Sequence, residues 1–202
     1  MPFPIVALVG YTNAGKSTLF NHLTGADVMA EDMLFATLDP TMRRIALPGG
    51  GPEVILSDTV GFISDLPTEL VAAFRATLEE VLSADLICHV RDISHPETES
   101  QKKDVEAILT SLKVDEATPR IEIWNKVDLL PEDERAALRT RAERHDDVQV
   151  LSAITGEGLP ELVDLIGGLL SGAARLETLV LPFSDGRRRA WLFQRDLIQS
   201  ET

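Results

Sequence analysis

An apolar run followed at once by a glycine-bounded loop is the feature that most constrains this chain. Residues Ile5 to Val9 are all apolar, the loop 10–17 reads Gly-Tyr-Thr-Asn-Ala-Gly-Lys-Ser, and a helical pattern follows it. The spacing G-x-x-x-x-G-K-[ST] between a strand and a helix predicts a phosphate-binding loop. Glycines let successive backbone N–H groups point at one phosphate, and the positive end of the helix dipole adds to that field. The alternative, a tight turn with an incidental lysine, is disfavoured by the flanking strand and helix.

The loop predicts specific contacts to a nucleotide. Lys16 is expected to reach the β- and γ-phosphates and to act in catalysis, and the Ser17 hydroxyl is expected to ligate Mg²⁺. The nucleotide-binding residues expected here form one continuous run: Gly10, Tyr11, Thr12, Asn13, Ala14, Gly15, Lys16, Ser17 and Thr18.

A second motif follows the apolar strand at 54–56. Its residues are Asp58, Thr59, Val60 and Gly61. An aspartate at a strand end can hold Mg²⁺ through a water molecule, and the Gly61 N–H can sense the γ-phosphate. Asp and Gly are common in ordinary turns, so the motif gains meaning from its distance after the phosphate-binding loop.

Two further motifs predict recognition of a guanine base. The Asp128 carboxylate can accept hydrogen bonds from guanine N1–H and the exocyclic amine, a pair that adenine does not offer, so GTP is favoured over ATP. The Lys126 stem can cover the base face, and the Asn125 amide can tie this loop to the phosphate-binding loop. A helix-capping turn is the alternative. The weaker motif comprises Ser152, Ala153 and Ile154, and the Ala153 N–H is expected to meet guanine O6.

Strand and helix patterns alternate along the chain. Strands are expected at 4–10, 42–47, 53–58, 85–92, 120–125 and 148–151, and helices at 16–24, 67–83, 98–113, 132–144 and 159–171. The turn 49–52 is too short for a crossover helix, so the strands beside it should pair antiparallel. The expected fold class is α/β: a three-layer sandwich of the P-loop NTPase type, with a mostly parallel six-stranded sheet and one antiparallel strand.

Composition limits the partners and the compartment. The chain has 202 residues and a formal net charge of -14, which disfavours direct binding to DNA or to anionic lipid. The lone Cys88 allows no internal disulfide and fits a reducing cytosol. No apolar run approaches the ~18 residues of a membrane span. We therefore expect a cytoplasmic protein, a monomer without a membrane span.

The sequence changes character after residue 172. Segments 176–183 and 189–193 have strand patterns joined across Ser184-Asp185-Gly186, a turn sequence, which predicts a short C-terminal β-hairpin. The expected domains are thus a nucleotide-binding domain at 1–173 and a partial C-terminal hairpin segment at 174–202. Since an isolated hairpin is marginal in water, we expect the chain to be a fragment of a longer protein.

Together these motifs resemble the guanine-nucleotide domain of the translation-factor-type GTPases, and four runs resemble the HflX family of ribosome-associated GTPases. The runs are GYTNAGKSTLFNHLT (10–24), LFATLDPTMRRI (34–45), LSDTVGFISDLPTELVAAFRATLEEV (56–81) and LPFSDGRRRAWLF (181–193). The resemblance implies that Phe35, Ala36, Thr37, Leu38 and Asp39 form the first nucleotide-sensing switch loop. Thr37 would be the second hydroxyl ligand of Mg²⁺ and a catalytic residue, with Thr41 as the competing candidate.

The resemblance also implies a cellular role. HflX proteins bind the large (50S) ribosomal subunit, hydrolyse GTP and split stalled ribosomes. We expect the N-terminal domain that makes much of their ribosome contact to be missing from this chain. An Obg- or Era-like ribosome-assembly GTPase is the alternative within the same class. A third possibility is a guanine-nucleotide-binding interaction module that does not hydrolyse GTP.

Two residues bear on the rate of hydrolysis. Phe62 stands where Ras has the glutamine that orients the attacking water, so intrinsic hydrolysis should be slow. Related GTPases with asparagine at the position of Asn13 bind K⁺ there. The alternative is that Asn13 only holds its own backbone turn. The expected cofactors are Mg²⁺ and, under the first reading of Asn13, K⁺, with GTP and GDP as substrate and product.

Overall fold

The sheet at the centre of the molecule has six strands. The computed structural model describes residues 3–25, 41–47, 52–59, 61 and 81–172, and the single positions 186 and 189. The strand order is β2-β3-β1-β4-β5-β6. The strands are β1 (Ile5–Gly10), β2 (Thr41–Ala46), β3 (Glu53–Asp58), β4 (Leu86–Asp92), β5 (Arg120–Asn125) and β6 (Val148–Val150).

Strand direction follows the length of each connection. β2 and β3, which are separated by a short turn, pair antiparallel, and every other neighbouring pair is parallel. Strand β1 is buried along its whole length, as expected for a central parallel strand covered on both faces. Edge strand β2 is largely exposed. The mostly parallel sheet with one antiparallel strand is therefore confirmed.

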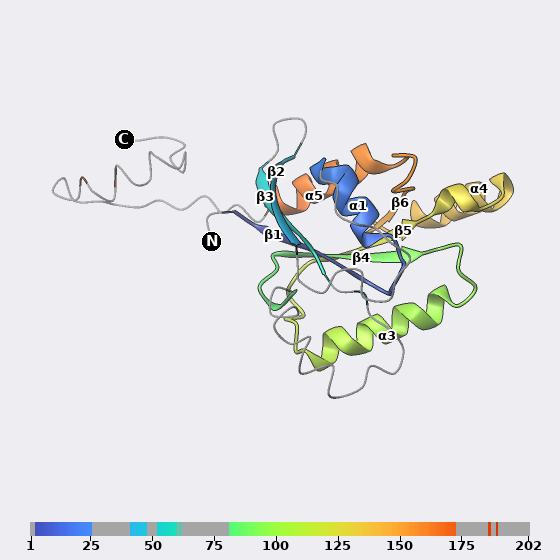
Figure 1. Cartoon of the computed structure of the whole chain (residues 1–202), viewed down its shortest axis with the longest axis horizontal. Coiled ribbons are helices and arrows are strands. Elements are labelled where there is room, and N and C mark those ends of the chain that lie inside the picture. Colours follow the sequence, from blue (N-terminus) through green and yellow to red (C-terminus); the bar gives the residue numbers. More distant parts are fainter. Residues whose placement is uncertain are drawn as a thin grey trace.

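Helices cover both faces of the sheet and make three layers (Figure 1). They are α1 (Lys16–Thr24), α3 (Thr98–Ser111), α4 (Glu132–Ala142) and α5 (Leu159–Gly172), with a 3-10 turn at Val127–Leu129. One core joins α1 and α5 to the sheet through residues such as Phe20 and Leu162. A second core, on the opposite face, joins α3 to the sheet through Val105 and Leu109.

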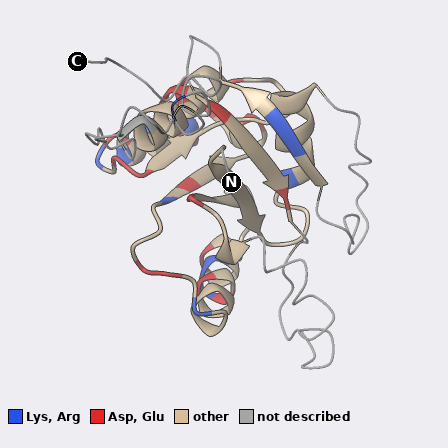
Figure 2. Cartoon of the chain, turned by 90° about the vertical axis from the view of Figure 1, so that its left-hand side faces the viewer, with Lys and Arg blue, Asp and Glu red and all other residues tan. Residues whose placement is uncertain are grey.

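Charged residues also fasten α3 to the sheet. Arg91 on β4 is buried, and its guanidinium donates to Glu122 on β5 at 2.7 Å and to Glu99 on α3 at 2.6 Å. Lys102 of α3 also pairs with Glu122. Burial alone would raise the pKa of Glu122, but hydrogen bonds from Lys102, Trp124 and Arg91 lower it to about 2. The same helix carries both signs of charge on its exposed side (Figure 2).

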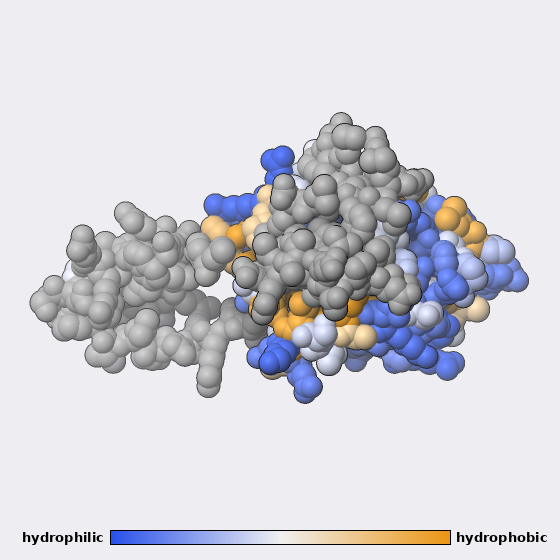
Figure 3. Space-filling model, turned by 60° about the horizontal axis from the view of Figure 1, so that its bottom comes forward, coloured by the Kyte–Doolittle hydropathy of each residue, from blue (hydrophilic) through white to orange (hydrophobic). Residues whose placement is uncertain are grey.

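The observed helices match the expected ones within a few residues wherever both can be compared. Of the helix expected at 67–83, only residues 81–83 are described: 81 and 82 are helical, and 83 is in a turn. Leu169 on α5 is exposed, although Ile166 and Leu170 of the same helix are buried. Among the described helices, none is long and apolar enough to cross a membrane, and hydrophilic residues predominate over the α4 side of the view in Figure 3.

The expected C-terminal hairpin lies outside the described residues, apart from Gly186 and Arg189. Both positions have helical backbone and are exposed, so the turn expected at Gly186 and the strand expected to begin at Arg189 are wrong at these two positions. The sequence explains the error. Arginine has a high helix propensity, so the residue type at position 189 does not favour a strand over helical backbone.

Candidate nucleotide-binding site

The motifs predicted from the sequence meet at the carboxyl-terminal edge of the parallel strands. Leu8 of β1 pairs with Asp58 of β3, and Asp92 of β4 pairs with Asn125 of β5. Those pairings bring the loops after four strands to one edge of the sheet (Figure 1). Ligands of open α/β sheets bind at this edge.

Two glycines of the phosphate-binding loop are required by close neighbours. A Cβ atom at Gly10 would lie 2.2 Å from the backbone carbonyl oxygen of Val90 on β4. Gly15 has φ +95°, and a Cβ there would lie 2.3 Å from the Asn125 side-chain nitrogen. Gly15 immediately precedes α1, so the first backbone N–H groups of that helix face the loop. The loop therefore has the form expected of a phosphate cradle.

Lys16 places a buried cation inside this loop. Its Nζ donates to the backbone carbonyls of Gly10 at 3.2 Å and Tyr11 at 3.1 Å, and the residue is buried. Burial lowers the pKa of Lys16 to about 8, against the attraction of the Asp58 carboxylate, which raises it. A phosphate group at this position would favour the charged ammonium.

Ser17 and Asp58 bring together the oxygen atoms that a magnesium ion would use. The Ser17 hydroxyl donates to Asp58 Oδ2 at 2.7 Å, across 41 residues of sequence. Asp58 is fully buried at the end of β3. A hydroxyl and a carboxylate are ligands suited to Mg²⁺, which usually keeps several waters and bridges to substrate phosphates. These residues fit the ion.

Gly61 lies against the phosphate-binding loop. A Cβ at this position would lie 2.9 Å from Thr12 Cα and 3.2 Å from Lys16 Nζ. This brings the second motif to the position where its glycine N–H can reach a terminal phosphate. Thr59 has a different role in the structure, because its hydroxyl donates to the Leu8 carbonyl of β1 and so ties β3 to β1. Val60 lies outside the described residues.

Asn125 links the phosphate-binding loop to the loop after β6. Its side-chain N–H donates to the Ala14 carbonyl at 2.9 Å, as expected from the sequence. Its side-chain oxygen accepts the Ala153 N–H at 2.9 Å. In this structure the Ala153 N–H is thus engaged by Asn125, and its expected contact with guanine O6 stays a prediction. The sequence alone could not show that the Asn125 side-chain amide accepts one hydrogen bond and donates another.

Asp128 offers a buried acceptor next to this link. Within the described part of the chain, its Oδ1 atom is buried and has no hydrogen-bond partner. Its backbone carbonyl accepts from Arg135 of α4 at 2.7 Å, which fixes the turn that carries it. Leu129 and Ile154, on the two neighbouring loops, are large apolar residues that are 62% and 71% exposed. A flat aromatic base would cover such surface and supply donors to the carboxylate.

Lys126 has an anchor that the sequence analysis missed. Its ammonium lies 2.8 Å from Asp92 Oδ2 at the end of β4. The signal that could have found Asp92 is positional, because it ends the parallel strand next to the one that Asn125 ends.

For several predicted site residues the structure gives only their position, or does not describe them. Residues 35–39, including Thr37, lie outside the described residues, and so does Phe62. Thr41 begins β2 and pairs with Asp58, so both side chains point to the same face of the sheet. Asn13 is exposed with φ +62°, a left-handed conformation that asparagine tolerates better than most residues. Thr18 and Ser152 lie where expected, at the start of α1 and directly after β6.

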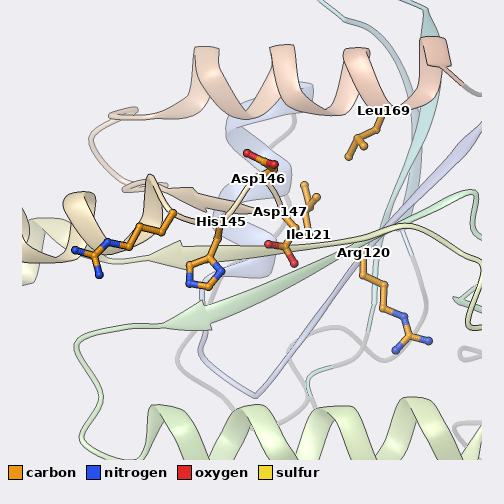
Figure 4. A pocket seen from close by; sticks show the side chains of 7 residues that line it. Arg120, Ile121, His145, Asp146, Asp147 and Leu169 are labelled. Carbon is orange, nitrogen blue, oxygen red and sulfur yellow. The ribbon is translucent and has the colours of Figure 1, made fainter.

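A cavity of about 420 Å³ lies elsewhere, at the amino end of β5. It is lined by Arg120, Ile121, Arg144, His145, Asp146, Asp147 and Leu169. Figure 4 shows that the side chains of Arg120 and His145 point in different directions rather than toward one another. The lining mixes opposite charges without a common focus, so the carboxyl-terminal edge remains the candidate site.

Two protein families match the chain. Residues 5–126 match the family described as 50S ribosome-binding GTPase. Residues 137–202 match the HflX C-terminal domain. The second match begins within α4, and thus inside the range expected for the nucleotide-binding domain.

Curated relatives cover almost the whole chain. GTPase HflX of Magnetococcus marinus is 52% identical over 192 residues, which is 95% of this chain and 43% of the relative. GTPase HflX of Escherichia coli K12 is 45% identical over 198 residues, which is 98% of this chain and 46% of the relative. The chain thus spans less than half the length of the curated relatives it matches.

Solved structures have the same fold. A GTP-binding protein from Sulfolobus solfataricus, in complex with GDP, superposes with a TM-score of 0.67 at 28% identity, over 85% of this chain and 53% of that one. A structure of Era in complex with MgGDPNP and ribosomal RNA has a TM-score of 0.65 at 24% identity, over 92% and 61% of the two chains. This second likeness concerns the fold alone.

Proposed function

The chain belongs to the family of 50S ribosome-binding GTPases as an HflX-type member, and from this we propose that it binds GTP and GDP with Mg²⁺ and hydrolyses GTP slowly. The observation that carries the proposal is the buried Oδ1 of Asp128, which has no hydrogen-bond partner among the described residues and lies three residues after the Asn125 amide that is bonded to the phosphate-binding loop. A buried acceptor is costly unless a partner is supplied, and guanine supplies N1–H and an amine.

The residues expected around the phosphates, which we call the phosphate half of the site, each have a defined role under this proposal. The N–H groups of the loop 10–17 and Lys16 hold the β- and γ-phosphates, and Gly61 touches the γ-phosphate through its backbone. Ser17 and Asp58, with Thr37 or Thr41, would hold Mg²⁺. When bound, the ion neutralises charge on the phosphate oxygens during transfer.

Slow hydrolysis follows from Phe62. A phenylalanine side chain cannot orient the attacking water, so a partner, backbone groups or an ion must complete the arrangement. We assign K⁺ at Asn13 to this role, although the left-handed backbone at Asn13 accounts for an asparagine there without any ion. If Phe62 marks lost catalysis instead, the domain is a nucleotide-binding interaction module.

The cellular role that we propose is that of the HflX family: binding to the large ribosomal subunit in the cytoplasm and splitting of ribosomes. The match at 137–202 supports an HflX-type role over an Obg- or Era-like one. A net charge of -14 does not favour RNA binding by this chain alone.

Titration calorimetry with GDP and GTP in Mg²⁺ tests nucleotide recognition. Asp128→Asn should weaken GDP binding about 100-fold, because two hydrogen bonds to a charged acceptor are lost, and should gain affinity for xanthine nucleotides. The matched control is Asp133→Asn, an exposed carboxylate on α4, which should bind GDP like the wild type. Unchanged GDP affinity in Asp128→Asn would contradict the assignment of base recognition.

Multiple-turnover phosphate release separates an enzyme from a binding module. We expect slow release by the chain alone, and faster release on addition of 50S subunits tests the family role. Assays in KCl and NaCl test Asn13: equal rates in the two salts would remove K⁺ from the proposal.

A further inference from the structure

We infer that Asp92 is a positioning residue of the base site, which acts by holding the ammonium of Lys126. The inference rests on the proposed function and extends it to a residue outside the four sequence motifs. It concerns the affinity for the base, not the chemistry at the phosphates.

Asp92 and Lys126 lie at the ends of neighbouring strands that end in register. Asp92 is the last residue of β4 and pairs in register with Asn125, the last residue of β5, and Lys126 follows directly. The Ile93 N–H donates to the Asn125 carbonyl at 3.0 Å, so the two strand ends are joined through the backbone as well. This fixes the distance that the lysine side chain must span.

The two oxygens of the Asp92 carboxylate have separate partners. Oδ1 accepts from the Ser94 backbone N–H at 3.0 Å and from the Ser94 hydroxyl at 2.6 Å. Oδ2 accepts from Lys126 Nζ at 2.8 Å. Ser94 therefore orients the carboxylate, and the carboxylate orients the lysine. The side chains of Asp92 and Lys126 are 14% and 25% exposed, so the pair is largely shielded from water.

Lys126 is held at both ends. Its backbone has φ +67°, a region that residues other than glycine rarely adopt and that persists where the surroundings impose it. Its ammonium is fixed by Asp92 at the other end. The four methylene groups between these points are thus preorganised as one wall of the base site, and binding a purine does not have to order them. Preorganisation raises affinity by removing that entropy cost.

The test measures GDP affinity and steady-state GTP hydrolysis in the full chain. Asp92→Asn should raise the GDP dissociation constant and the KM for GTP about tenfold, the size expected for a charged hydrogen bond, with kcat unchanged. Lys126→Met keeps the stem but lacks the ammonium, and it should show the same tenfold change. In the double variant the second substitution should add nothing, because both remove one interaction.

Controls separate positioning from folding. Ser94→Ala leaves the Asp92–Lys126 pair in place and should change GDP affinity less than Asp92→Asn does. Glu53→Gln breaks an exposed ion pair with Arg44 far from the site and should change nothing. Additive effects in the double variant, or wild-type affinity in both single variants, would overturn the inference alone. Wild-type chain that binds no guanine nucleotide would overturn the proposed function, and this inference with it.

Discussion

The phosphate half and the base half of the site are built in different ways. The phosphate half consists mainly of one continuous loop, residues 10–17, whose contacts are made by backbone groups and the buried Lys16. The base half is assembled from residues after three strands, and side chains hold it together: Asp92 holds Lys126, and Asn125 holds Ala153.

The difference teaches where specificity is encoded. A backbone cradle depends on local conformation, so a short stretch of sequence is enough to specify it. The base half depends on strand register, because a carboxylate after β4 can meet a lysine after β5 only if those strands end together. Asn125 is bonded to both halves, so the two are expected to respond together when the junction is disturbed.

The largest effect is expected at that junction, from Gly15→Ala. The new methyl group would lie 2.3 Å from the Asn125 side-chain nitrogen, at a residue with φ +95°. Asn125 must move, which breaks its bonds to Ala14 and Ala153 and disturbs both halves. Two lost buried hydrogen bonds cost about 1–3 kcal/mol each, so GDP affinity should fall by at least about 30-fold. Calorimetry with GDP measures the loss.

Gly25→Ala is the matched control for this substitution. Gly25 ends α1 with φ +63°, so alanine there has comparable backbone strain, but nothing lies within 4 Å of the added Cβ. It should lower the melting temperature slightly and leave GDP affinity unchanged. Equal losses of affinity in the two variants would mean that backbone strain, and not contact with Asn125, explains the requirement for glycine at position 15.

The sequence predicted the phosphate half better than the base half for the same physical reason. Gly10, Gly15 and Lys16 were identified from their spacing, and the structure brings them together in one loop, while their contacts to phosphate stay a prediction. Asp92 was left unassigned, and the hydrogen bond from the Ala153 N–H to Asn125 was not foreseen, because both depend on which strand ends lie side by side. Strand order and register are long-range properties that a local pattern does not contain.

Lys16 gives a pH dependence that belongs to the phosphate half alone. Burial lowers its pKa to about 8 in the free chain, and bound phosphates should raise it again. At pH 7 the lysine is charged with or without nucleotide, so affinity is constant. Above pH 8 the free chain must take up a proton in order to bind, and GDP affinity should fall by up to about tenfold per pH unit.

Calorimetry at pH 7.0 and 8.5, in two buffers of different ionisation enthalpy, measures this proton uptake directly. Lys126→Met is the control, because it removes a lysine of the base half and should keep the uptake that Lys16 causes. Binding at pH 8.5 without proton uptake would show that Lys16 does not change charge state when the phosphates bind.

The smallest effect is expected from Thr59→Val, which separates a structural residue of the phosphate half from its binding residues. The buried Thr59 hydroxyl donates to the Leu8 carbonyl, so its loss should lower the free energy of unfolding by about 1 kcal/mol and the melting temperature by about 3 °C. GDP affinity should stay within about twofold of wild type. Thr110→Val removes a similar but exposed bond to Glu106 on α3 and should cost less stability. A large loss of GDP affinity in Thr59→Val would mean that the Thr59 side chain contacts the nucleotide. The phosphate half would then not be built mainly from backbone groups, and the contrast with the base half would fail.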